Sequence, residues 1–179
     1  MARFMQRLNS VFVRACSGFW SLRDEVDESF VDRVLAIDWI RFQITHGAAT
    51  EIPHYLIVLA QNRTFSNAIH QLSIHLCDQN TCVTGASAQS LPFLLELLEC
   101  HDDKLVSHIL DLLSAFAHCT NPKHPDNLDG GSFLDFEREI RDRLLNTMPT
   151  FRKLLGRQNT AVSDSARSVI EALTGPQPA

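Results

Sequence analysis

The chain of 179 residues is long enough for one domain with a sizeable core, and its 45% apolar and 21% charged residues are typical of a folded protein and exclude a disordered one. Its net charge is −5. No acidic residue precedes Asp24, whereas several arginines do, so residues 24–179 carry 12 basic and 21 acidic residues. This excess of acids argues against a nucleic-acid partner, and the lack of an apolar run near the roughly 18 residues of a membrane helix argues against insertion in a bilayer.

The first predicted element covers residues 4–19, where apolar residues recur at helical spacing opposite Arg3, Arg7 and Arg14. Two interpretations of residues 1–23 remain open. An Arg-rich segment without acids is typical of a mitochondrial transit peptide, which is removed after import. We favour a capping helix that covers the first structural repeat of a cytoplasmic protein, since helices with basic faces are common.

A second helix is predicted for residues 24–43, because acids in its first turn suit the positive end of the helix dipole. Its apolar face would contain Phe30, Val34, Ile37, Ile40 and Ile44. The Gly-Ala-Ala-Thr sequence at residues 47–50 should end this helix, with Thr50 as N-cap of the next one.

Three later segments share one pattern, an apolar residue followed by proline and an apolar helical stripe. They begin at Ile52-Pro53, Leu91-Pro92 and Met148-Pro149. The first two prolines are 39 residues apart, near the roughly 40–47 residues of a HEAT-type repeat. The next interval is 57 residues, which we attribute to a loop at residues 119–131.

Each of these segments precedes a second amphipathic stretch, so the unit is a helix pair. The predicted helices are 51–60 with 64–77, 86–99 with 102–118, and 132–155, interrupted near Pro149, with 161–173. Because one pair cannot bury its apolar face alone, the pairs must stack. The sequence therefore predicts an all-α fold, an α-solenoid of about eight helices in HEAT- or armadillo-like antiparallel pairs over residues 24–174, with a disordered tail at 175–179.

The five cysteines are scattered and lie mostly within helical patterns. They are Cys16, Cys77, Cys82, Cys100 and Cys119. We interpret them as reduced, mostly buried thiols of a cytosolic-type compartment. His118, Cys119 and His124 lie close in sequence, but zinc sites usually need two closely spaced ligand pairs, so we predict no metal and no other cofactor.

No arrangement of catalytic residues stands out either. A cysteine and a histidine can be paired in several ways, but nothing supplies the orienting third group or an oxyanion site, and Gly130-Gly131 lacks the context of a phosphate loop. We therefore predict that the protein is not an enzyme. Trp20 and Trp39 lie in or beside apolar stripes, which favours core packing over partner binding.

Charged residues offer a candidate partner surface. Residues 137–143 alternate in sign at helical spacing, which usually indicates a solvent-exposed face and is also compatible with a binding strip. Farther along lies a local basic patch. The candidate partner-binding residues are Arg141, Arg152, Lys153, Arg157 and Arg167.

Residues 38–118 resemble a family of mostly uncharacterised HEAT-repeat proteins of bacteria and fungi. The resemblance rests on Asp38-Trp39, the turn and acid-apolar-proline motif at 46–53, the loop at 79–81, the small residues at 86–88 and Leu91-Pro92-Phe93-Leu94. The loop in this chain lacks the family's histidine and glycine. This resemblance implies a helical-repeat fold and no catalytic residues.

These observations favour a non-catalytic module that binds an unknown protein partner through one curved helical face. Two alternatives remain open. One is an accessory or lyase-like HEAT protein that binds a tetrapyrrole-type cofactor, and the other is a HEAT-type DNA-binding protein.

Overall fold

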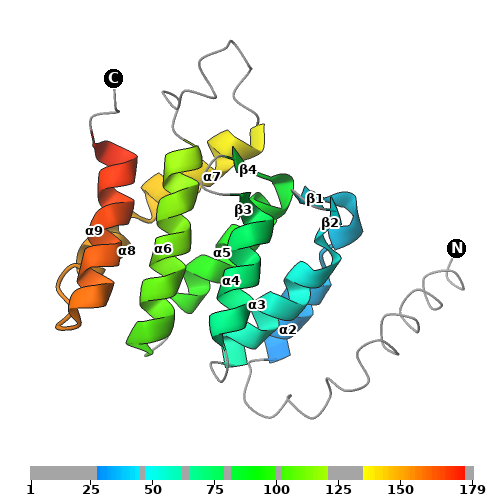
Figure 1. The fold of residues 1–179 in the computed structure, drawn as a ribbon, viewed down its shortest axis with the longest axis horizontal. Helices are drawn as coiled ribbons and strands as arrows, with labels where there is room; N and C mark the ends of the chain where they lie inside the picture. Colours follow the sequence, from blue (N-terminus) through cyan, green and yellow to red (C-terminus); the bar gives the residue numbers. More distant parts are fainter. Residues whose placement is uncertain are drawn as a thin grey trace, which may run out of the picture.

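The computed structural model describes residues 28–44, 47–61, 65–78, 82–99, 102–120 and 135–175. These residues are mostly α-helical, which confirms the predicted all-α class (Figure 1). Several predictions lie outside them: the helix at 4–19 with Cys16 and Trp20, the first residues of the helix at 24–43, Cys100, the loop at 121–131 with His124, and the tail from residue 176.

The helix predicted for residues 24–43 was wrong at its end, because α2 (Glu28–Leu35) stops earlier. Trp39 folds back onto the end of α2 and its Nε1–H donates to the carbonyl oxygen of Val34 at 2.8 Å. This bond satisfies a carbonyl group that has no partner within the helix, and it buries the indole. Ile40, which was expected on the apolar face, is 70% exposed.

Short elements connect α2 to the next helix. They are the 3₁₀ helix η2 (Trp39–Arg41), the antiparallel strands β1 (Gln43–Ile44) and β2 (Gly47–Ala48), and the 3₁₀ helix η3 (Ala49–Glu51). Gln43 pairs with Ala48, and Ile44 with Gly47. Thr50 is not the predicted N-cap, because it lies within η3.

The remaining helices agree with the predicted pairs to within one or two residues, and the predicted start of the 132–155 helix at residues 132–134 lies outside the described residues. They are α3 (Ile52–Gln61), α4 (Phe65–Leu76), α5 (Gly85–Leu97), α6 (Asp103–Cys119), α7 (Asp135–Asn146), α8 (Met148–Leu154) and α9 (Thr160–Thr174). The predicted interruption near Pro149 is the break at Thr147 between α7 and α8, where a proline in the first turn of α8 needs no backbone donor. Pro53 also lies in a first turn, whereas Pro92 lies inside α5.

Local capping explains where two of these helices begin. The Asp102 carboxylate accepts from the backbone N–H groups of Lys104 and Leu105 at 2.8 and 3.2 Å. The Asn159 side chain does the same for the first turn of α9. Each cap satisfies amide groups that have no partner within the helix.

The helices form two layers. In one layer α4, α6 and α9 lie side by side, with α6 in contact with both neighbours (Figure 1). In the other layer α3 packs against α5, and α5 against α7. Contacts between α3 and α4, α5 and α6, and α8 and α9 hold the two layers together.

The core runs without interruption between the layers, and α6 lies at its centre. The apolar stripe of α6 is buried along its whole length; its residues are Leu105, Val106, Ile109, Leu112, Leu113 and Phe116. Trp39 is also buried, as predicted. Because α6 contacts α4, α5, α7 and α9, it connects the N-terminal and C-terminal parts of the fold.

We expect Phe116→Ala to lower the free energy of unfolding by about 3–5 kcal/mol, because it empties the space of a fully buried ring at the middle of the core. Asp111→Ala, on the exposed side of the same helix, should change it by less than about 0.5 kcal/mol. Urea unfolding monitored by circular dichroism measures both values. Equal effects of the two substitutions would contradict the central position of α6.

Candidate functional site

A small hairpin lies between the predicted helices 64–77 and 86–99. Strand β3 (Cys77–Asp78) follows α4 directly and pairs with β4 (Cys82–Val83), with Cys77 opposite Val83 and Asp78 opposite Cys82. Both strands contact α6. The hairpin therefore carries Cys77 to α6.

Ser87 fixes the hairpin to the first turn of α5. Its buried hydroxyl donates to the carbonyl oxygen of Leu76 and accepts from the backbone N–H of Thr84 at 2.9 Å. Thr84 is the N-cap of α5, so one hydroxyl links the end of α4 to the start of α5. Ser87 was not singled out from the sequence, although a polar side chain three residues after Thr84 is the signal of a capping box.

The hairpin and the end of α6 bring two thiols together. The Sγ atoms of Cys77 and Cys119 lie 3.1 Å apart, and both residues are buried, at 4% and 2% exposure. The cysteines are 42 positions apart in the sequence. Cys77, Cys82 and Cys119 are in the reduced form in this structure, as expected, but the proximity of two of them was not predicted from the sequence.

A signal for this pair was present in the sequence. Cys77 directly follows α4 and Cys119 ends α6, and these are the second helices of two consecutive pairs. In a stack of equivalent pairs, corresponding helix ends lie next to one another.

The environment of the Cys119 thiol favours its protonated form. Its hydrogen bond with Cys77 raises the pKa of Cys119 most, burial raises it further, and the nearby charges of Cys77, Cys82 and Glu137 add to the effect. The Cys119 thiol is therefore neutral near pH 7.

Glu137 was wrongly predicted to lie on a solvent-exposed face, because it is only 8% exposed. It shares one face of α7 with the buried Ile140 and Leu144, at helical spacings of three and seven residues. That face packs towards α5 and α6. The spacing to these two apolar residues was the signal that could have predicted its burial.

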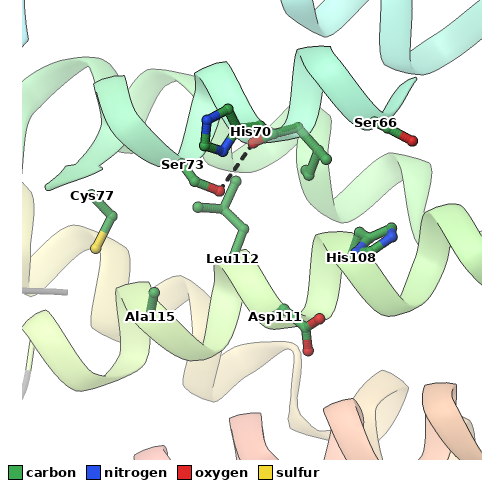
Figure 2. A pocket seen from close by; sticks show the side chains of 9 residues that line it. Ser66, His70, Ser73, Cys77, His108, Asp111, Leu112 and Ala115 are labelled. Carbon is green, nitrogen blue, oxygen red and sulfur yellow. Dashed lines mark hydrogen bonds between the residues drawn. The ribbon is translucent and has the colours of Figure 1, made fainter. Parts of the chain in front are cut away.

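A groove of about 340 Å³ runs between α4 and α6 and ends at Cys77 (Figure 2). Its lining residues are Ser66, Ile69, His70, Ser73 and Cys77 from the α4 side and His108, Asp111, Leu112 and Ala115 from α6. Ile69 and Leu112 are buried beneath it. His70 and Asp111 are exposed. The groove thus combines an apolar floor with hydrogen-bonding side chains.

A second hollow, of about 370 Å³, lies between α6 and α9. Its lining residues are His118, Ser168, Glu171, Ala172 and Gly175. Both hollows therefore lie along α6, one on each side, within the layer of α4, α6 and α9.

Three of the candidate partner-binding residues interact within the chain. Arg157 pairs with Asp103 at 2.6 Å, and Arg167 pairs with Asp164 at 2.7 Å. Arg141 donates from Nη2 to the carbonyl oxygen of Leu173 at 3.1 Å. Burial lowers the pKa of Arg141, although the neighbouring acid Asp142 raises it.

Arg152 and Lys153 are exposed in the last turn of α8. The candidate basic residues thus spread over α7, α8, α9 and the connection between α8 and α9, and neither hollow is lined by any of them. Among the residues that the structure describes, no group of three or more His, Cys, Asp or Glu side chains is placed to hold a metal ion.

A scan against protein-family models and searches of curated proteins and of solved structures find no match to this chain. The resemblance to HEAT-repeat proteins therefore stays a prediction. None of the described helices combines the length and apolar character that crossing a membrane requires.

We expect Ser87→Ala to lower the free energy of unfolding by about 1–3 kcal/mol. The substitution leaves the buried carbonyl of Leu76 and the N–H of Thr84 without their shared partner. Urea unfolding measures the loss, and Ser168→Ala on the exposed side of α9 is the matched control. A loss no larger than that of the control would show that Ser87 does not anchor the hairpin.

The raised pKa of Cys119 also predicts how stability depends on pH. The pKa of this thiol is higher in the folded chain than its ordinary value of 9.0. Its contribution to stability is therefore fully present when the pH is below 9.0, and it is lost progressively as the pH rises above 9.0. Above pH 9 we expect the unfolding free energy to fall by up to about 1.4 kcal/mol for each pH unit. Urea unfolding from about pH 7.5 to pH 10.5 should show a shallower decline for Cys119→Ala, and parallel declines would contradict the shift.

Proposed function

We propose that the protein is a non-catalytic interaction module, built as a stack of HEAT- or armadillo-like helix pairs, whose α4, α6 and α9 layer binds a protein partner. The order of contacts supports the stack. The pairs are α3 with α4, α5 with α6, and α8 with α9. The second helices α4, α6 and α9 are neighbours in one layer, and in the other layer α3 contacts α5, which contacts α7. This is the packing expected when each unit buries its apolar face against the next one.

The position of the two hollows carries the proposal. Both open between successive helices of one layer, where a repeat protein offers an extended binding surface. In the groove between α4 and α6, an apolar floor at Ile69 and Leu112 is edged by polar side chains. A largely apolar centre with a polar rim is typical of protein interfaces.

The side chains of this layer indicate the chemistry of the partner. Asp111 and Glu171 contribute acids, and His70 and His118 contribute hydrogen-bonding rings. We therefore propose a partner segment that carries small apolar side chains and basic groups. Charge complementarity of this kind contributes to specificity and to the rate of association.

A site-specific photo-crosslinking residue at the exposed position of Ser66 tests this assignment in full-length protein added to native extract. We expect one discrete crosslinked partner, whose yield falls at least about tenfold when Asp111→Lys reverses the charge in the groove. Urea unfolding of the Asp111→Lys protein, compared with Asp111→Ala, shows whether changes at position 111 disturb folding.

The double variant Arg152→Glu/Lys153→Glu is the matched control on α8, where both residues are exposed. We expect it to keep the crosslinked yield. If this variant abolishes the product while Asp111→Lys does not, the partner binds the basic residues and the groove assignment is wrong.

A further inference from the structure

The two buried thiols are already placed for a covalent bond. A disulfide requires its sulfur atoms at about 2.05 Å, so the 3.1 Å between Cys77 and Cys119 leaves about 1 Å to close. The backbone on both sides is held in place. Cys77 is paired in the β3–β4 hairpin, and the hydroxyl of Thr120 donates to the carbonyl oxygen of Phe116 at 2.8 Å just beyond Cys119.

We propose that Cys77 and Cys119 form a redox site that changes between a dithiol and an intramolecular disulfide, with a small disulfide such as glutathione disulfide as the oxidant. This inference concerns the thiol pair alone and is independent of the proposed partner.

The groove determines which sulfur reacts first. Cys77 lines the end of the groove between α4 and α6, whereas Cys119 is not among its lining residues (Figure 2). A small disulfide in the groove therefore reaches Cys77 before Cys119. Cys77 is the attacking thiol, and Cys119 is the resolving thiol.

Each step balances in atoms and electrons. The Cys77 thiolate, which has lost its proton to solvent, attacks one sulfur of glutathione disulfide, so that a Cys77–glutathione bond forms and a glutathione thiolate leaves. Cys119 then loses its proton to solvent and attacks the Cys77 sulfur, which forms the Cys77–Cys119 bond and releases the second glutathione thiolate. Two electrons pass from the two cysteines to glutathione disulfide, and excess thiol reverses both steps.

Cys82 supplies an internal comparison. It lies opposite Asp78, whereas Cys77 lies opposite Val83, so Cys77 and Cys82 occupy opposite faces of the hairpin. Cys82 is exposed. We therefore expect Cys82 to react with soluble reagents but not to replace either member of the pair.

The test treats folded full-length protein with glutathione disulfide, blocks the remaining thiols and identifies linked peptides by mass spectrometry. Cleavage on the N-terminal side of Asp78 separates Cys77 from Cys82. We expect the Cys77–Cys119 link as the main product, with a melting temperature about 5–10 °C above that of the reduced protein, because the bond restricts a long loop of the unfolded chain. Dithiothreitol should reverse both changes.

Variants test the order of the steps. We expect Cys119→Ser to accumulate glutathione on Cys77, Cys77→Ser to leave Cys119 unmodified over the same time, and Cys82→Ser to form the link at the wild-type rate. Glutathione on Cys119 in the Cys77→Ser variant would overturn the assigned order. Two results with the wild-type protein would overturn the redox site. One is a disulfide that forms mainly through Cys82, and the other is unreacted Cys77 and Cys119 in protein whose Cys82 is fully modified. Neither result depends on whether the variants with substituted buried cysteines fold.

Discussion

Burial of α6 among its neighbours is the interaction on which the rest of the structure depends. Its stripe from Leu105 to Phe116 fills the space between the two layers, and it is the helix that contacts both α4 and α9. An isolated helix of this length is only marginally stable in water, so the burial of this apolar stripe supplies most of the stability. The hollows on either side of α6 and the thiol at its end take their positions from that packing.

The thiol pair shows how narrowly this packing sets a local geometry. Cys119 is the last residue of α6. Moving this cysteine by one position along the helix would turn its side chain by about 100° around the helix axis. Ser87 holds the Cys77 side through its bonds to Leu76 and Thr84, and the Thr120 hydroxyl bonds to the Phe116 carbonyl beside Cys119, so hydrogen bonds of neighbouring residues hold the backbone on both sides of the pair. Burial then helps to keep the Cys119 thiol neutral, because together with the Cys77 hydrogen bond it raises the pKa.

The charged residues lie in two kinds of surroundings in this fold, in contacts within the chain and around the hollows. Arg157 and Arg167 form ion pairs near α6 and on α9, and Arg141 ties α7 to the end of α9. Of these contacts, the Arg157 pair joins the connection after α8 to α6, and the Arg141 bond joins α7 to α9. The polar side chains around the hollows include His70 and Asp111, which are exposed on the layer of α4, α6 and α9.

The sequence by itself determined where most helices begin and end, because apolar spacing, the Asp102 cap and the proline of α8 act within a few residues of chain. Only the tertiary structure decided that α2 ends at Leu35 and that Cys77 meets Cys119. Each of these depends on contacts between separate segments or on a side chain that folds back, and no local pattern records the distance between residues that are 42 positions apart.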